Sequence, residues 1–73
     1  MSKLKYYREK AGMSQSELAS ILDVSQRYIA FLETGERTPS LYLAQKIANY
    51  FKVSIEDIFL PTKRTKSTQN INN

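Results

Sequence analysis

Cysteine, histidine and tryptophan are all absent from this 73-residue sequence, and glycine and proline occur only twice each. Without cysteine the chain has neither disulfide bonds nor thiolate metal ligands, which fits a cytoplasmic protein. Without histidine it lacks the most common general base, the most common metal ligand and every nucleophile pair that depends on an imidazole. We therefore expect no catalytic residues, no metal site and no cofactor, and so a protein that is not an enzyme.

The sequence also lacks long apolar runs and a large net charge over residues 1–60. No apolar run approaches the ~20 residues needed to span a bilayer, so we expect no membrane partner. The length allows one small domain. The formal net charge is +4, but Lys63, Arg64 and Lys66 supply three of the excess charges, and residues 1–60 carry a net charge of only +1. Net charge is thus a weak argument for nucleic acid, and the positions of the basic side chains must decide.

The segment 15–33 is the most informative part of the chain, because it contains two helix starts in close succession. Ser14 followed three residues later by Glu17 is a capping box, in which side chain and backbone satisfy each other's hydrogen bonds. Ser25 is a second N-cap, and only two residues separate the two predicted helices. So short a connection forces the helices to cross steeply, and the small Ala19 lets their backbones approach. This is the helix-turn-helix arrangement, whose second helix can lie in the major groove of DNA.

Apolar periodicity elsewhere predicts three further helices, so the expected fold is all-α. We expect a compact five-helix helix-turn-helix domain over residues 1–60. Residues 61–73 contain a single apolar side chain, Ile71. Such a segment buries too little surface to offset the entropy of the chain, so we expect a polar tail that is disordered or loosely attached. The alternative is an arm that binds a partner subunit or DNA phosphates.

Capping and helix-stopping residues set the predicted boundaries. The first helix is expected over Ser2–Lys10, with Gly12 after it as a left-handed stop. A fourth helix is expected over Ser40–Phe51, and a short fifth helix opens at Ser54 and ends before Pro61. The apolar side chains expected to face the core from the three middle helices are Leu18, Ala19, Ile21, Leu22, Ile29, Ala30, Leu32, Leu41, Ala44, Ile47, Ala48 and Phe51.

Residues spread over most of the chain match a known family of DNA-binding proteins: Gln15, Glu17-Leu18-Ala19, Val24-Ser25-Gln26, Ile29, Leu32-Glu33, Gly35 and Pro39-Ser40-Leu41. On these residues the sequence resembles the small repressors of the lambdoid phage repressor/Cro type, also called the XRE family, over about residues 4–60. The family usually has glycine at the turn, where this chain has Asp23, a residue that tolerates positive φ at modest cost. The resemblance implies a sequence-specific transcriptional regulator, a homodimeric repressor that reads a palindromic operator.

The outward face of the predicted helix 25–33 is the candidate DNA-reading surface, since its N-terminal residues enter the groove in this arrangement. Gln26 can pair with adenine, Arg27 with guanine or with a phosphate, and Phe31 can contact a thymine methyl group. Ser25 and Tyr28 complete the face. The alternatives are that Tyr28 and Phe31 pack onto the core, and that Gln26 and Arg27 form an ordinary solvated surface.

The remaining site residues follow from the resemblance. It implies that Gln15 grips a phosphate and supports the reading side chains; the alternative is a solvent-facing residue that begins the helix. Ser14 and Ser16 can add hydroxyl contacts. It also implies that Arg37 and Thr38, in the loop after the reading helix, touch the DNA backbone, which sets register without reading sequence.

An ion pair and a dimer surface complete the predictions. The resemblance implies a partly buried pair between Arg8 and Glu33. Apolar residues left over at the other end of the chain suggest a twofold dimer contact through the fifth helix and the turn before it. The alternative function is an antitoxin or other protein-interaction module on the same fold, because residues 1–60 are nearly balanced in charge. The residues proposed for the dimer contact are Tyr42, Tyr50, Ile55, Phe59 and Leu60.

Overall fold

Five α-helices joined by short loops make up residues 2–59, the part of the chain that the computed structural model describes. The prediction of an all-α, five-helix fold is confirmed. Leu60 and the predicted tail over 61–73 lie outside the described residues. The helices are α1 (Leu4–Lys10), α2 (Gln15–Leu22), α3 (Gln26–Thr34), α4 (Leu41–Phe51) and α5 (Ile55–Phe59).

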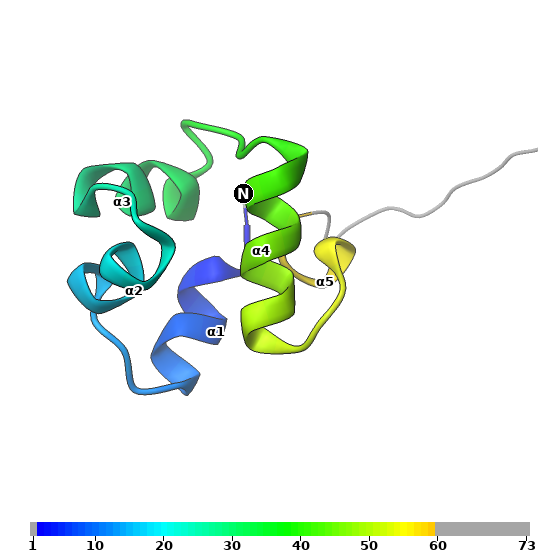
Figure 1. Ribbon diagram of the computed structural model, residues 1–73, viewed down its shortest axis with the longest axis horizontal. Helices are drawn as coiled ribbons and strands as arrows, with labels where there is room; N and C mark the ends of the chain where they lie inside the picture. Colours follow the sequence, from blue (N-terminus) through cyan, green and yellow to red (C-terminus); the bar gives the residue numbers. More distant parts are fainter. Residues whose placement is uncertain (1, 60–73) are drawn as a thin grey trace, which may run out of the picture.

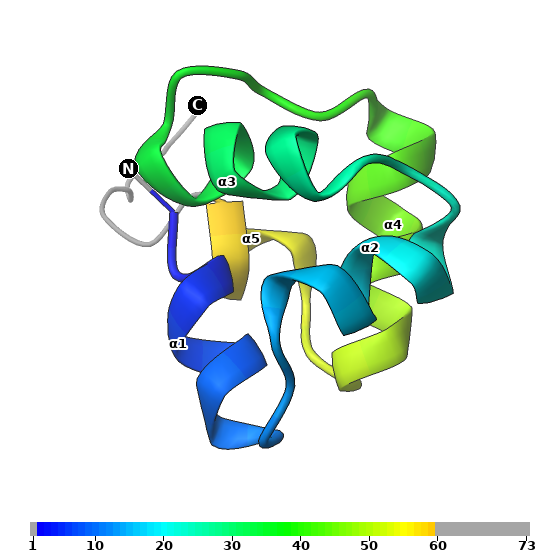
Figure 2. The ribbon, with the colours of Figure 1, turned by 90° about the vertical axis from the view of Figure 1, so that its left-hand side faces the viewer.

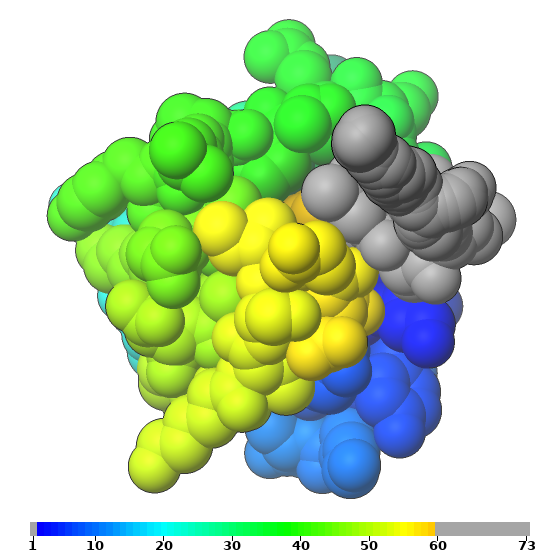
Figure 3. Space-filling model, turned by 90° about the vertical axis from the view of Figure 1, so that its right-hand side faces the viewer, coloured from blue at the N-terminus to red at the C-terminus, as the bar shows by residue number. Residues whose placement is uncertain are grey.

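The helix-turn-helix pair lies at one end of the molecule. α2 and α3 pack against each other there, and α4 and α5 pack against each other at the opposite end (Figure 1). α1 contacts both α3 and α5, and so connects the two ends. α2 and α3 face the viewer together in Figure 2, whereas α4 and α5 lie at the centre and left of the face shown in Figure 3, beside α1.

A serine immediately precedes each of the helices α2 to α5, and its side chain caps the first turn, as the sequence predicts. Ser14 Oγ accepts from the Glu17 N–H at 3.0 Å while Glu17 Oε1 accepts from the Ser14 N–H at 2.8 Å, which completes the capping box. Ser25, Ser40 and Ser54 each accept from the backbone N–H three residues on, at 3.0, 3.1 and 3.2 Å. Each such cap contributes about 1 kcal/mol to the stability of its helix.

The first helix begins later than predicted, at Leu4 rather than Ser2. Ser2 Oγ donates to the Leu32 carbonyl at 2.9 Å, and the Lys3 N–H donates to the Ile58 carbonyl at 2.7 Å. These bonds hold Ser2 and Lys3 against α3 and α5, so the two residues form a short non-helical segment that contacts both helices and do not form a first helical turn.

The core contains most of the side chains expected there, with two exceptions. Ile21 is 45% exposed, because it lies roughly 100° around α2 from the centre of the stripe formed by its buried neighbours. Leu41 is 77% exposed, and so is Tyr42 beside it, so the first turn of α4 projects beyond the core. Ala30 and Phe51 are half-buried. The main buried cluster consists of Leu4, Leu18, Ala19, Leu22, Ile29, Leu32, Ile47 and Ile58.

The elbow between α2 and α3 depends on a left-handed residue. Asp23 has a φ of +60° and a ψ of 45°, and the Val24 N–H donates to the Ala19 carbonyl at 3.0 Å. Val24 packs against the core and Ala19 is buried, as expected for a close crossing. The strain at this elbow is modest, because aspartate occupies this region more easily than most residues.

Replacing Asp23 with glycine is expected to stabilise the fold by about 0.5–1 kcal/mol, since glycine reaches a positive φ without a steric cost. Lys52, which has the same φ of +60° after α4, provides a matched position. Because lysine lacks the short polar side chain that eases this conformation, Lys52→Gly should gain at least as much. Urea denaturation of both variants measures the change, and a loss of stability in either would contradict the assignment of strain to these φ angles.

Candidate nucleic-acid interface

The first turn of α3 presents polar side chains to solvent. Ser25, Gln26 and Arg27 are exposed, while Tyr28 is half-buried and packs against the core. The structure thus separates the predicted reading residues into two groups. Gln26 and Arg27 are accessible to a partner, whereas most of the Tyr28 ring serves packing.

A buried ion pair fixes the far end of α3 against α1. Arg8 Nε donates to Glu33 Oε2 at 2.5 Å and Arg8 Nη2 to Glu33 Oε1 at 3.3 Å, and each residue is only 8% exposed. Arg8 Nη1 also donates to the Met13 carbonyl at 2.8 Å. The hydrogen bond from Arg8 to Glu33 raises the pKa of Arg8 above its ordinary value, and the opposing effect of burial is smaller. Arg8 therefore stays charged at any working pH.

Gln15 extends this pair to the start of α2. Gln15 Nε2 donates to Glu33 Oε1 at 3.0 Å, so the carboxylate of Glu33 is shared by side chains from α1 and α2. Neither spacing nor composition indicates this contact, because the two residues lie 18 positions apart. Its consequence is mechanical: the N-terminal end of α2 and the C-terminal part of α3 are held in one fixed relation.

Phe31 is half-buried beneath two guanidinium groups. The Arg27 Cζ atom lies 5.4 Å and the Arg37 Cζ atom 5.6 Å from the centre of the Phe31 ring, which are cation–π distances. Phe31 is not part of the main buried cluster. The i, i+4 spacing could have predicted the contact with Arg27. The contact with Arg37 depends on the path of the loop after α3, which local sequence does not reveal.

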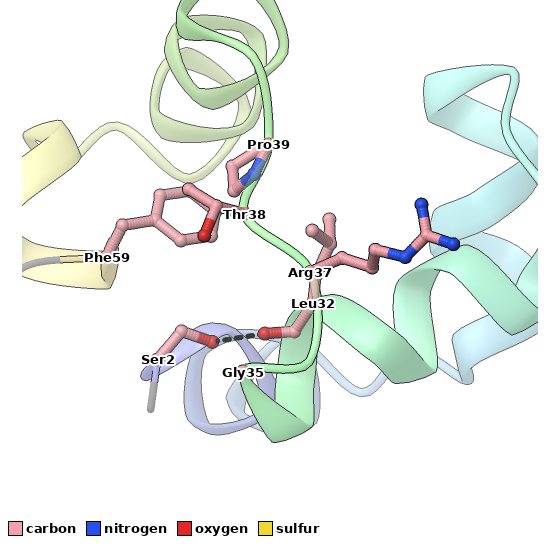
Figure 4. A pocket seen from close by; sticks show the side chains of 7 residues that line it. All are labelled: Ser2, Leu32, Gly35, Arg37, Thr38, Pro39 and Phe59. Atoms are coloured by element: carbon pink, nitrogen blue, oxygen red, sulfur yellow. Dashed lines mark hydrogen bonds between the residues drawn. The ribbon is translucent and has the colours of Figure 1, made fainter.

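The loop after α3 also borders a small pocket on its inner side (Figure 4). Thr38, another predicted backbone contact, is exposed on this loop. The Arg37 side chain extends away from the pocket, along the outside of α3 (Figure 4). At about 100 Å³ the pocket is below the ~300 Å³ typical of small-molecule sites, so we assign it no ligand. Its lining residues are Ser2, Leu32, Gly35, Arg37, Thr38, Pro39 and Phe59.

Other kinds of site find no support within residues 2–59. No group of three or more carboxylate, imidazole or thiol side chains comes together there to hold a metal ion. None of the helices in this range has the length and apolar character to cross a lipid bilayer. The exposed polar face of α3, together with the start of α2 and the loop after α3, is the candidate interface.

Comparison with known proteins shows the family to which the whole described domain belongs. A family model described as helix-turn-helix matches residues 4–58. An uncharacterized HTH-type transcriptional regulator of Methanocaldococcus jannaschii is 51% identical over 59 residues, which cover 81% of this chain and 89% of that protein. A regulator of the same description from Archaeoglobus fulgidus is 46% identical over 59 residues, covering 81% and 84%. One from Bacillus subtilis is 38% identical over 58 residues, covering 80% and 88%.

Proposed function

Because the chain belongs to the helix-turn-helix family of the phage repressor/Cro type, we propose that it is a DNA-binding transcriptional regulator that inserts α3 into the major groove. The observation that carries the proposal is the polar first turn of α3, which is exposed at Gln26 and Arg27 while the helix itself is packed and hydrogen-bonded against α2. We further propose a homodimeric repressor that reads a palindromic operator in the cytoplasm.

The roles proposed for the interface follow from the chemistry of each side chain. The carboxamide of Gln26 matches the N6 and N7 edge of adenine, and the Ser25 hydroxyl suits a base or a phosphate. Gln15 and Ser14 lie at the N-terminus of α2, where the helix dipole and the backbone N–H groups that the capping box does not use favour a phosphate. Thr38 adds a backbone contact from the loop. Tyr28, whose ring is mostly packed, is left with its hydroxyl for a contact at the rim of the groove.

The dimer is proposed to form through α5 and the turn before it, with exposed side chains of α4. Tyr42 and Tyr50 are exposed, and Ile55 and Phe59 are half-buried, so these residues leave apolar surface on α4 and α5. A twofold axis here would present two copies of α3 to half-sites about one helical turn, ~34 Å, apart. Leu60, the fifth residue of the proposed contact, lies outside the described residues.

Selection of duplexes from a random library tests the proposal directly. The full chain should enrich two related half-sites in inverted orientation, separated by about one turn of DNA. Sedimentation equilibrium on the selected duplex should give two protein chains per site. Recovery of duplexes with no shared sequence would overturn the regulator proposal, and a single half-site bound by one chain would overturn the dimer.

Gln26→Ala is expected to weaken binding to the selected duplex by about 1–3 kcal/mol and to relax the preference at one base pair in each half-site. The reason is that a bidentate amide contact to adenine is lost while the backbone contacts remain. Gln45→Ala is the matched control, because Gln45 is an exposed glutamine on α4 whose amide binds Asn49 at 3.0 Å. Competition titrations should show no change for Gln45→Ala. Equal effects of the two substitutions would remove Gln26 from the reading face.

A protein-interaction module, such as an antitoxin, is a second candidate function. The observation in its favour is the exposure of Leu41 and Tyr42, each 77% accessible at the start of α4. Large apolar side chains adjacent on a surface are typical of a protein contact. A stoichiometric partner that co-purifies with the chain from nuclease-treated lysate, and is lost with Tyr42→Ser, would support this role. Absence of any partner under these conditions would leave DNA binding as the function.

A further inference from the structure

Arg27, Phe31 and Arg37 form a stack on the outer side of α3, and we infer that it is a phosphate-binding unit. In this unit the two arginines bind DNA backbone phosphates and Phe31 is a positioning residue that holds them. The inference deepens the proposed function and rests on it. The new element is the role of Phe31, which contacts guanidinium groups in place of a thymine methyl group. Of the two partners expected for Arg27 the inference selects the phosphate, and the backbone contact of Arg37 is the one that the resemblance already implies.

The first support is the shared ring. With Cζ atoms 5.4 and 5.6 Å from one ring centre, the two guanidinium groups lie no more than 11 Å apart. They come from different elements, the first turn of α3 and the loop beyond its end. Exposed arginine side chains lose considerable rotamer entropy when a ligand fixes them. A ring that restrains both in the free protein lowers that cost on binding.

The second support is the way in which the loop is attached to Phe31. The Phe31 carbonyl accepts from the Gly35 N–H at 3.1 Å, from the Arg37 N–H at 3.2 Å and from the Thr34 hydroxyl at 3.2 Å. The backbone of Arg37 is therefore bound to the same residue whose ring its side chain covers. Because Gly35 takes a φ of +87°, the chain reverses immediately after α3 and brings Arg37 back over it.

The third support is electrostatic. Neither Arg27 nor Arg37 forms an ion pair with any residue between 2 and 59. Within the same range Arg8 forms an ion pair with Glu33. Two like charges over one ring repel each other, and the repulsion is relieved when anions bind. A guanidinium group presents its N–H donors in a fork that matches phosphate oxygens. Phosphates of the DNA backbone supply such anions at close spacing, whereas one base pair offers a single guanine edge.

The stack itself can be tested without DNA. In the free protein, the side-chain protons of Arg27 and Arg37 should be shifted upfield by the ring current of Phe31. They should return to ordinary values in Phe31→Leu and stay shifted in Phe31→Tyr, which keeps the ring. Circular dichroism establishes that both variants are folded. Ordinary arginine shifts in the folded parent chain would overturn the inference before any DNA is added.

Binding to the selected duplex tests the role of the stack. Arg27→Ala and Arg37→Ala should each weaken binding to every sequence alike, and each should lower the slope of log affinity against log salt by about 0.9. Phe31→Leu should weaken binding by about tenfold, and Phe31→Tyr by less than about twofold, because a tyrosine ring replaces the lost cation–π contacts. In a chain that already carries Arg27→Ala and Arg37→Ala, Phe31→Leu should have no further effect.

Two results contradict the inference. If Arg27→Ala relaxes the preference at one base pair, Arg27 reads a base. If Phe31→Leu costs the same with and without the two arginines, Phe31 acts through packing or through a base of its own.

Tyr6→Leu is the matched control, since it removes a ring covered by Lys10 at 5.6 Å on the exposed side of α1, and it should leave DNA binding unchanged. Failure of the parent chain to bind any duplex overturns the proposed function, whereas the proton shifts still report on the stack.

Discussion

Glu33→Ala is expected to lower the free energy of unfolding by about 3–5 kcal/mol, because it leaves the buried charge of Arg8 without its partner. A single core in a chain of this size supplies only about 3–5 kcal/mol in total, so the variant should be largely unfolded at room temperature. Circular dichroism in the absence of denaturant measures the folded fraction. A variant that melts within a few degrees of the parent would show that the pair contributes little.

Two further variants, one at Glu9 and one that replaces both Arg8 and Glu33, serve as controls for the effect of Glu33→Ala. Glu9 approaches Arg8 at 4.0 Å but is mostly exposed, so Glu9→Ala should change stability by less than about 0.5 kcal/mol. The double replacement Arg8→Met with Glu33→Leu removes both charges and should cost clearly less than Glu33→Ala alone, the remaining cost coming from the Met13 carbonyl and the Gln15 amide, which lose their partners. The pKa of Arg8 is higher in the folded chain than in the unfolded chain, so protonation of Arg8 stabilises the fold. This stabilisation is fully present below the pKa of the unfolded chain and is lost only in strong alkali, as the pH rises through the pKa of the folded chain. The cost of Glu33→Ala should therefore be nearly constant from about pH 6 to about pH 9.

Leu18→Ala is expected to cost about 2–5 kcal/mol, the range for truncating a fully buried leucine. Leu18 is completely inaccessible and belongs to the cluster that joins α2 and α3 to the rest of the molecule. Ile21 is the matched control, because it is a similar apolar residue three positions on but is 45% exposed. Ile21→Ala should cost less than about 1 kcal/mol. Urea denaturation compares the two, and equal costs would mean that Ile21 is covered in solution.

The contrast between Leu18 and Ile21 shows what apolar periodicity predicts in this chain and what it does not. Both residues satisfy a helical spacing, and the spacing correctly predicts α2. Which of the two is buried depends on how wide a stripe the neighbouring helices cover, and that is a tertiary property. The same holds at Leu41, which fits the stripe of α4 but lies in a turn that no other described element covers. Local signals such as the capping box of Ser14 and Glu17 were predictable, because both partners lie within four residues.

The candidate interface divides in the same way. The exposure of Gln26 and Arg27 follows from the helix-turn-helix spacing. The bond between Gln15 and Glu33, and the position of Arg37 over the Phe31 ring, connect residues that only the folded chain brings together. Phe31 was expected to reach a thymine methyl group because an exposed aromatic needs a partner. In the free chain two guanidinium groups lie over the Phe31 ring, and sequence spacing alone could suggest only the one of Arg27.

Amide chemical-shift mapping of the chain on the duplex selected from the random library tests the central claim most directly. The account predicts that the largest changes fall on the first turn of α3, the start of α2 and the loop carrying Arg37. It also predicts that these changes weaken together as salt is raised. Changes centred on α4 and α5, with the amides of Gln26 and Arg27 unaffected, would contradict the assignment of α3 as the helix that reads DNA.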